Sequence, residues 1–461
     1  MEEFDEEVDP SDLAFDYANK LMERGHRTIA GHKVLVIQPV LKGGQTSSQH
    51  SSTLALQLAE AVSLVHTLPG WSVVDTQRAH MRSATKRAMF GKGTLQDLKK
   101  KIQTDQEVSA VFLDVDRLSG LQKGFLEVSW GRPVLDRFEL VLEIFKSHAS
   151  SKEAKLQIAL AEVHFRKSHL RQAVEELDQQ GGGQQYIGGG GETLLEKQQR
   201  LLRDKEGALR KALAKLKQKR GLLRAGREKK NFPHVAVVGY TNAGKTSLIK
   251  ALTGSSKLDP QDRLFATLDV TSHVGQLTNR MRVIFLDTVG FIANLPHELI
   301  ASFSATLEDV LHADLILLVT DVSHPDWPSQ RLNVLSVLHD LGVDQNLLDN
   351  VVEVSNKVDL IPAGSGEELS EDSLPVSAKE GTGVTFLKEV IEQRLLDVTD
   401  LVKCAVKIPQ AGLHLGWLYK EATVEEVSPI EGDEEHLRLD AVFSKSAFAK
   451  FCAQFGDSRI T

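Results

Sequence analysis

His234–Leu252 reads HVAVVGYTNAGKTSLIKAL, and this stretch decides the fold of the chain around it. A β-branched run, His234–Val238, predicts a strand, and Ser247–Leu252 has a helical pattern. Between them, Gly239–Thr246 has the spacing GxxxxGK[ST]. The glycines allow backbone N–H groups to surround phosphate oxygens, and the helix N-terminus adds its positive end. The stretch therefore predicts a strand, a phosphate-binding loop and a helix.

Two side chains of this loop have expected roles of their own. Lys245 would neutralise the β- and γ-phosphates, and the Thr246 hydroxyl would bind Mg²⁺. A chance match on a glycine-rich turn is the alternative for this motif alone, because several of its positions are free. The expected nucleotide contacts are Gly239, Tyr240, Thr241, Asn242, Ala243, Gly244, Lys245 and Thr246.

A second motif follows the predicted strand Arg282–Leu286 and has the form DxxG. Asp287 would hold Mg²⁺ through water, and the amide of Gly290 could sense the γ-phosphate. Ahead of it, the sequence LFATLD places Thr267 where a switch threonine could bind the same Mg²⁺. The nucleotide contacts expected from these two segments are Phe265, Ala266, Thr267, Leu268, Asp269, Asp287, Thr288, Val289 and Gly290.

Two more motifs would select the base. The strand Val351–Ser355 ends in NKVD, whose Asp359 can accept hydrogen bonds from guanine N1–H and N2–H₂, a pair that adenine does not offer. Val376 leads into SAK, whose backbone would meet guanine O6. The contacts expected here are Asn356, Lys357, Asp359, Ser377, Ala378 and Lys379. All four motifs end predicted strands, where parallel α/β sheets bind ligands, so residues 231–398 predict a guanine-nucleotide-binding domain.

The residue after DxxG bears on catalysis. In many small GTPases it is a Gln that orients the attacking water, whereas here it is Phe291, which cannot do so. Catalysis would then depend on positioning supplied elsewhere, with a plain core role as the alternative for Phe291. The candidate catalytic residues are Lys245, Thr267, Gly290 and Phe291.

The chain before this domain divides into three predicted parts. Residues 1–30 are polar, and residues 31–149 alternate strands with helices, which predicts an α/β domain with a mostly parallel sheet. In residues 150–230, apolar residues repeat every seven positions on both sides of a glycine-rich segment, Gly181–Gly191. This pattern predicts two antiparallel helices joined by a flexible tip. The heptad positions are Leu156, Val163, Leu170 and Leu177, then Leu195, Leu202, Leu209, Leu216 and Leu223.

The second of these helices is strongly basic. Residues 197–230 hold fourteen Lys/Arg and three Asp/Glu, a local balance of 14 − 3 = +11 in a chain whose net charge is −8. This concentration predicts a polyanionic partner, with a solvated helix face as the alternative. Tyr186 within the glycine segment suits stacking on a base, with a disordered linker as the alternative for that segment.

Composition excludes several classes of protein. The 461 residues are 41% hydrophobic, and no run approaches the 18 apolar residues of a membrane span. Two cysteines, Cys404 and Cys452, exclude a disulfide framework and fit a reducing compartment. The acidic N-terminus, MEEFDEEVDP, is neither a secretory signal nor an Arg-rich transit peptide. Residues 399–461 predict a small α+β domain with an interaction role.

These motifs resemble the HflX family of translational GTPases. The resemblance rests on GYTNAGKT at 239–246, LFATLD at 264–269, NKVD at 356–359, and above all DTVGFIANLPHELIASFSATLEDV at 287–310. FGKG at 90–93 and GETLLE at 191–196 also match, and GWLYKEATVEEV at 416–427 resembles the mitochondrial animal members. Where bacterial members have GxRGPGET, this chain has YIGGGGET.

The resemblance implies a GTPase with GTP or GDP and Mg²⁺ as ligands, stimulated by the ribosome and located in mitochondria, with the cytoplasm as the alternative. It implies binding to the large ribosomal subunit, the helical tip reaching rRNA of the peptidyl transferase centre, and the splitting or recycling of ribosomes. A large-subunit assembly factor and a signalling GTPase without an RNA partner remain alternatives. Asn242 resembles an asparagine that binds K⁺ in some related GTPases. We expect a monomer with neither a DNA nor a membrane partner.

Overall fold

The computed structural model describes most of the chain. It covers residues 31–41, 54–179, 194–228, 232–256, 258–261, 263–268, 270–293, 309–361, 372–399, 401–410, 412–430, 433–456 and 458–460. The predictions for residues 1–30, for the glycine-rich segment with Tyr186 and for Asp269 lie outside this part. No helix in the described part is long and apolar enough to cross a membrane.

The chain divides into two compact units, which are described separately. Unit 1 consists of residues 1–219, 263–269 and 292–305, and unit 2 consists of residues 220–262, 270–291 and 306–461. The short segment 263–269 is therefore grouped with unit 1, although it lies between two stretches of unit 2 in the sequence. The division into five domains stays a prediction.

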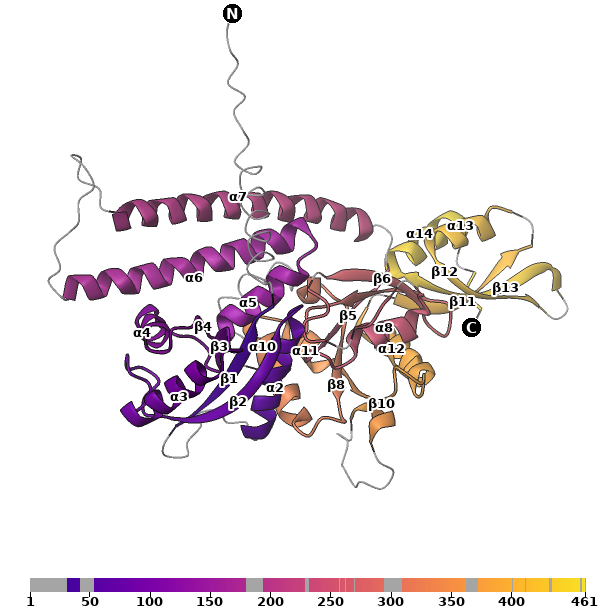
Figure 1. Cartoon of the computed structure of the whole chain (residues 1–461). Coiled ribbons are helices and arrows are strands. Elements are labelled where there is room, and N and C mark those ends of the chain that lie inside the picture. The colour runs from indigo at the N-terminus through magenta and orange to yellow at the C-terminus, as the bar shows by residue number, and fades with distance from the viewer. Residues whose placement is uncertain are drawn as a thin grey trace, which may run out of the picture. The chain divides into compact units, whose positions relative to one another are not determined.

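Unit 1 contains a four-stranded parallel sheet in the order β2-β1-β3-β4 (Figure 1). The strands are β1 (Lys33–Leu41), β2 (Ser72–Met81), β3 (Ala110–Leu113) and β4 (Val134–Leu135). The helices between and after them are α2 (Leu54–Thr67), α3 (Lys92–Thr104), α4 (Gly120–Trp130) and α5 (Arg137–His148). All four residues of β3 are buried, as expected for a strand covered on both faces.

Two long helices follow this sheet: α6 (Lys152–Gln179) and α7 (Leu194–Glu228). Side chains of α6 meet α7 where both His164 and Lys167 contact the carboxylate of Glu206. Partial burial raises the pKa of Glu206, but hydrogen bonds from Lys167 and Arg210, together with the one from His164, outweigh it and hold this pKa at about 2, well below its usual value. On α7, Leu209 and Ala212 are buried, so this helix has one apolar contact face.

Unit 2 is built on a six-stranded sheet in the order β10-β9-β8-β5-β7-β6. The strands are β5 (His234–Gly239), β6 (Thr271–Gln276), β7 (Arg282–Asp287), β8 (Leu315–Asp321), β9 (Val352–Asn356) and β10 (Leu374–Val376). All neighbours are parallel except the edge strand β6, which is antiparallel to β7. This confirms the predicted mainly parallel sheet, whereas β6 was not expected from the sequence.

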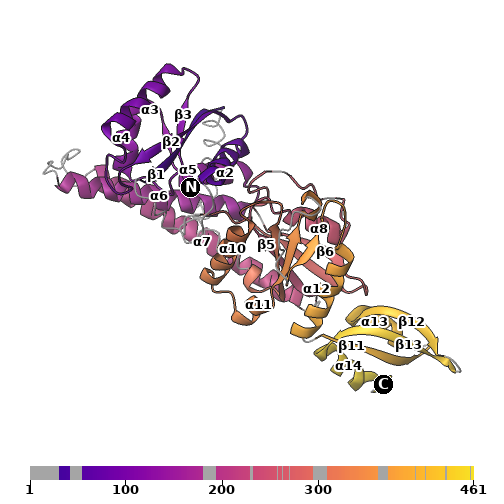
Figure 2. The same cartoon turned by 90° about the horizontal axis from the view of Figure 1, so that it is seen from below.

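Helices cover both faces of this sheet (Figure 2). Two helices, α8 (Lys245–Thr253) and α12 (Val384–Val398), contact each other and lie on one face. On the other face lie α10 (Trp327–Asp340) and the short α11 (Gln345–Asp349). Because helices cover both faces, both faces of the sheet are apolar. Ligands of such sheets bind at the carboxyl ends of the strands, so the candidate site is formed by the residues that follow β5, β7, β8 and β9.

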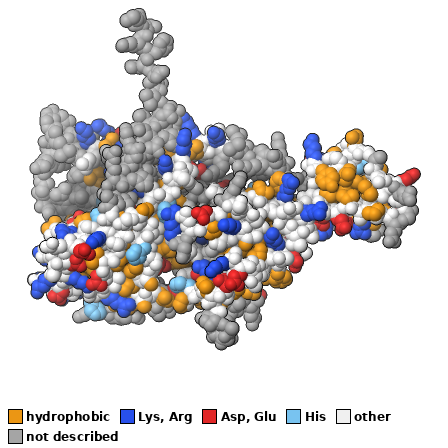
Figure 3. Space-filling view, turned by 45° about the vertical axis from the view of Figure 1, so that its right-hand side comes forward, with side chains coloured by type: hydrophobic (Ala, Val, Ile, Leu, Met, Phe, Trp, Pro, Cys, Tyr) orange, Lys and Arg blue, Asp and Glu red, His pale blue; other side chains and the backbone are white. Residues whose placement is uncertain are grey.

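The C-terminal part of unit 2 has a separate antiparallel sheet in the order β11-β13-β12. Its elements are β11 (Leu401–Pro409), α13 (His414–Glu421), β12 (Thr423–Ile430), β13 (Asp433–Ser444) and α14 (Lys445–Phe455). Its core contains Val406, Leu439, Phe443 and Phe451. Hydrophobic side chains also gather on the surface of this part (Figure 3). Leu413, which is 81% exposed, is the residue before α13, and Tyr419, which is 63% exposed, belongs to α13.

The edge strand β6 yields a test of packing in unit 2. A Cβ added at Gly275 would lie 2.6 Å from the ring of Phe285, which is fully buried on β7. We expect Gly275→Ala to lower the free energy of unfolding of unit 2 by about 1–3 kcal/mol, because a packed aromatic ring must shift. Urea unfolding measures this in the transition that GDP stabilises. Val274→Ala is the control, since Val274 is 65% exposed, and equal stabilities of the two variants would contradict the expectation.

Candidate nucleotide-binding site

The phosphate-binding loop connects β5 to α8, as the sequence predicts. Gly244 caps α8 in a left-handed conformation with φ 91°, which a residue with a side chain rarely adopts. A Cβ at Gly244 would also lie 2.3 Å from the Asn356 side-chain nitrogen. Glycine is therefore required here for backbone conformation and for the approach of β9.

Asn356 at the end of β9 joins two of the predicted motifs. Its side-chain Nδ2 donates to the carbonyl of Ala243 in the phosphate loop at 2.9 Å. Its Oδ1 accepts from the backbone N–H of Ala378 at 3.1 Å. The side chain is only 2% exposed. One buried amide thus holds the phosphate loop and the SAK loop in a fixed relation.

Two of the three oxygen ligands expected for a metal ion, Thr246 and Asp287, lie together in unit 2. The Thr246 hydroxyl donates to the Asp287 carboxylate at 2.7 Å, and Asp287 is 1% exposed. A hydroxyl and a carboxylate are hard oxygen donors of the kind that Mg²⁺ prefers, so these residues fit the ion. Elsewhere in the described ranges, no cluster of three or more His, Cys, Asp or Glu side chains is arranged to hold a metal.

Lys245 is buried beneath the phosphate loop. Its ammonium donates to the carbonyls of Gly239, at 3.3 Å, and Tyr240, at 3.0 Å. Burial lowers the pKa of Lys245 to about 8, and the nearby Asp287 carboxylate opposes part of that shift. Two neutral carbonyls solvate an ammonium less well than water does, so an incoming phosphate would restore favourable surroundings for the charge.

The DxxG segment lies directly against the phosphate loop. A Cβ at Gly290 would lie 2.9 Å from Thr241 Cα and 3.0 Å from Lys245 Nζ. Phe291 donates its N–H to the Gly239 carbonyl at 3.1 Å and accepts from the Thr241 N–H at 2.6 Å. The Phe291 side chain is 4% exposed. Phe291 therefore packs as a core residue while its backbone pairs with the phosphate loop.

Other residues of these loops have supporting contacts. Thr288 donates its hydroxyl to the Val237 carbonyl at 2.7 Å, which ties the DxxG segment to β5. Asn242 has a positive φ of 61°, and its binding of K⁺ stays a prediction. Val289 is buried as well.

The base-selecting motifs also meet. Ser377, which is fully buried, donates its hydroxyl to Oδ1 of Asp359 at 2.6 Å. Lys357 adopts a left-handed conformation with φ 66°, and its ammonium pairs with Asp321 Oδ2 at 2.7 Å. The exposed Lys379 continues the SAK loop. These contacts orient the Asp359 carboxylate and hold the turn that carries it.

The LFATLD segment is arranged differently from the other motifs. Its described residues are grouped with unit 1. Phe265 and Leu268 are buried, whereas Ala266 and Thr267 are half-buried. The other four motifs belong to unit 2. Contact of Thr267 with a metal ion held by Thr246 and Asp287 stays a prediction.

Sequence reasoning missed one supporting residue of the base site. Asp321 ends β8 and forms the ion pair with Lys357. A carboxylate at the end of a buried parallel strand was the available signal, because ligand sites of such sheets form at that edge.

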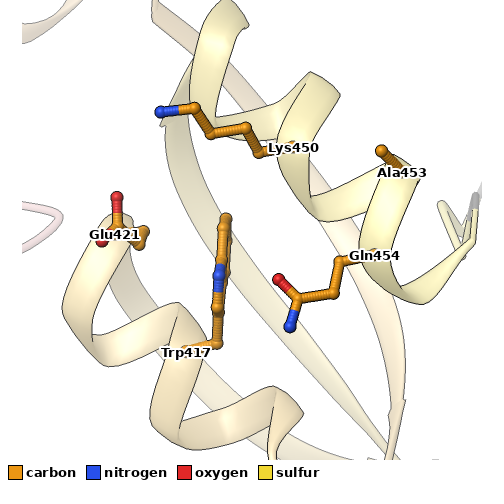
Figure 4. A pocket seen from close by; sticks show the side chains of 5 residues that line it. All are labelled: Trp417, Glu421, Lys450, Ala453 and Gln454. Atoms are coloured by element: carbon orange, nitrogen blue, oxygen red, sulfur yellow. The ribbon is translucent and has the colours of Figure 1, made fainter.

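A separate pocket lies in the C-terminal part of unit 2 (Figure 4). Its volume is about 420 Å³, and Trp417 of α13 lies across from Lys450 and Gln454 of α14. None of the predicted nucleotide contacts lies in its lining.

The fold and this site define a P-loop GTPase. Three family models match the chain: "GTP-binding GTPase N-terminal" over residues 55–146, "GTP-binding GTPase Middle Region" over 148–227, and "50S ribosome-binding GTPase" over 234–357. The chain belongs to the HflX family of GTPases, and it hydrolyses GTP.

Relatives span most of the chain. GTP-binding protein 6 of Xenopus laevis is 47% identical over 98% of this chain and 84% of its own length. GTPase HflX of Caldanaerobacter subterraneus is 38% identical over 72% of this chain and 76% of its own. A chloroplastic GTP-binding protein of Arabidopsis thaliana is 39% identical over 62% of this chain and 51% of its own.

The lowered pKa of Lys245 predicts how nucleotide affinity depends on pH. In the free protein Lys245 loses its proton near pH 8, whereas bound phosphate favours the ammonium and raises the pKa. GDP binding then requires proton uptake above pH 8, so we expect Kd for GDP to rise about fourfold from pH 7 to pH 8.5. Titration calorimetry across this range measures it. Lys245→Arg stays charged and should remove the dependence, while a flat wild-type profile would refute it.

Proposed function

We propose that this GTPase binds the large ribosomal subunit in its GTP form and splits or recycles ribosomes, and that hydrolysis permits release. The main support is the charge of α7. In Lys197–Lys219 eight Lys and Arg side chains are exposed, against two acidic residues in the same stretch. Such a surface fits the phosphates of rRNA. The family model described as a 50S ribosome-binding GTPase supports the same partner.

The two long helices supply the geometry of the proposal. In this proposal α6 and α7 form a hairpin, held by contacts such as those of His164 and Lys167 with Glu206. The residues between the two helices would then reach single-stranded rRNA of the peptidyl transferase region. The protein would act as a monomer, with its hairpin as a wedge whose engagement depends on the nucleotide.

The nucleotide would control this engagement through two segments. GTP would order the LFATLD and DxxG segments through Thr267, Asp287 and Gly290, and loss of the γ-phosphate would relax them. Mg²⁺, held by Thr246 and Asp287, would supply charge neutralisation at the phosphates. Because Phe291 cannot orient water, we propose that turnover is slow in the isolated protein and faster on the ribosome.

An organelle is the proposed location. The Arabidopsis relative is named as chloroplastic, and the sequence resembles mitochondrial animal members of the family. Binding and splitting should therefore be measured with mitochondrial ribosomes.

Charge reversal on α7 tests the ribosomal partner. In gradient sedimentation with a non-hydrolysable GTP analogue, we expect the wild type to convert mitochondrial monosomes into subunits and to travel with the large one. The exposed Lys211 and Lys219, changed together to Glu, should weaken large-subunit binding about tenfold or more, because phosphate contacts are lost. Lys99→Glu with Lys100→Glu makes the same charge change on α3 and is the control.

The outcomes separate the candidate functions. Intact monosomes without a large-subunit complex would refute splitting. If the protein binds only immature large subunits, and if the Lys245→Ala variant still binds them, the results would favour an assembly factor. Equal binding by both charge-reversal variants, with no dependence on salt, would favour a signalling GTPase without an RNA partner.

Base selection is tested at Asp359. Asp359→Asn replaces one acceptor oxygen by a donor, so the pair of hydrogen bonds to guanine N1–H and N2–H₂ is lost. We expect affinity for GDP to fall about 100-fold, and xanthosine diphosphate, which has a carbonyl at position 2, to bind more tightly than GDP. Competition binding with GDP and xanthosine diphosphate measures this change in nucleotide preference. An unchanged preference for GDP would remove Asp359 from the base site.

A further inference from the structure

The segment that carries Thr267 is held by unit 1 through a contact that the nucleotide motifs do not explain. Phe265, two residues before Thr267, is 1% exposed and packs edge-on against Phe145 of α5, with ring centroids 4.8 Å apart. Phe145 is itself fully buried. Aromatic pairs in this geometry stabilise a structure by more than the burial of their area alone. The Phe265 ring therefore holds its segment firmly on α5.

The backbone of Phe265 is attached as well. Its carbonyl lies 2.9 Å from Nδ1 of His148, the last residue of α5. Since a carbonyl only accepts, His148 must carry its proton on Nδ1 for this bond to form. Burial and the positive charge of Arg263 lower the pKa of His148 to about 4, so the ring is neutral at physiological pH and keeps this donor.

Phe265 adopts an unusual conformation in this contact. Its φ is +52°, in the left-handed region that bulky side chains rarely enter. Such a conformation persists where the surrounding contacts over-determine it, and it is concentrated at functional segments. On the other side of Thr267, Leu268 is 3% exposed. Thr267 is therefore bracketed by two buried residues, while it is half-buried itself.

We propose that Phe265 and His148 are positioning residues for GTP hydrolysis. The contact of Phe265 with Phe145 and His148 fixes the backbone of the segment that carries Thr267, the residue to which the proposed function assigns contact with the metal and the γ-phosphate. The conformational entropy of ordering the Phe265 end of this segment is then lost on folding, so that GTP has only the Thr267 end to order in each cycle. The inference rests on the proposed metal role of Thr267.

The role predicts an effect on turnover without an effect on binding of the diphosphate. GDP lacks the γ-phosphate that Thr267 would face. The affinity of the protein for GDP should therefore not depend on the contact of Phe265 with Phe145 and His148, which we call the Phe265 anchor. Phe265→Ala should lower kcat for GTP about tenfold, because the segment must be ordered in each cycle, and change KM and the Kd for GDP less than twofold. Single-turnover hydrolysis by the full chain with Mg²⁺, and calorimetry with GDP, measure these quantities.

Variants of His148 separate positioning from packing. His148→Asn places an amide N–H near the position of Nδ1 and should retain most of kcat, whereas His148→Leu keeps bulk without a donor and should lose it. Phe125→Ala is the control for general weakening of unit 1, since Phe125 packs against the core of the sheet through α4. An equal loss of kcat in Phe125→Ala, or an unchanged kcat in Phe265→Ala, would overturn the proposal.

Thr267→Ala distinguishes this inference from the proposal beneath it. If Thr267→Ala lowers kcat and Phe265→Ala does not, the anchor inference alone fails. If Thr267→Ala leaves kcat unchanged, the metal role of Thr267 fails. A loss of kcat in both variants, with GDP binding retained, supports both.

Discussion

The two hydrogen bonds of the Asn356 amide are the constraint on which the nucleotide site depends. One joins the phosphate loop at Ala243, and the other joins the SAK loop at Ala378. Because the amide is buried, neither bond can be exchanged for water without loss. The side chain can reach the phosphate loop because Gly244 has no Cβ. The two loops that are predicted to bind the phosphates and the base are thus joined by the Asn356 side chain, which fits because Gly244 has no side chain.

Around this link, the free protein stores unfavourable electrostatics that a nucleotide would relieve. Lys245 is buried against two carbonyls, and its pKa is lowered to about 8. The Asp287 carboxylate is held by the Thr246 hydroxyl and is almost fully buried. Phosphate and a divalent cation would bring the missing opposite charges to both groups. The backbone hydrogen bonds between Phe291 and the phosphate loop are already made in the free protein.

Much of the fold could be predicted from local patterns. The strand, glycine loop and helix at 234–252 and the mainly parallel sheet behind them follow from hydrophobic runs and from glycine positions, both of which are local properties. The edge strand β6 could not be predicted so easily. Its sequence, TSHVGQ, has few apolar residues, and it is a strand because β7 supplies an antiparallel partner.

The sequence by itself determined where the motifs lie: a phosphate-loop pattern, a DxxG segment and an NKVD segment, each at a strand end, because their spacing is a local property. The ligand contacts of their residues stay predictions. Only the tertiary structure decided what supports them. The pairing of Lys357 with Asp321 and the packing of Phe265 on Phe145 and His148 join residues 36 to about 120 positions apart. Such contacts depend on how strands and helices come together in space, which no local pattern records.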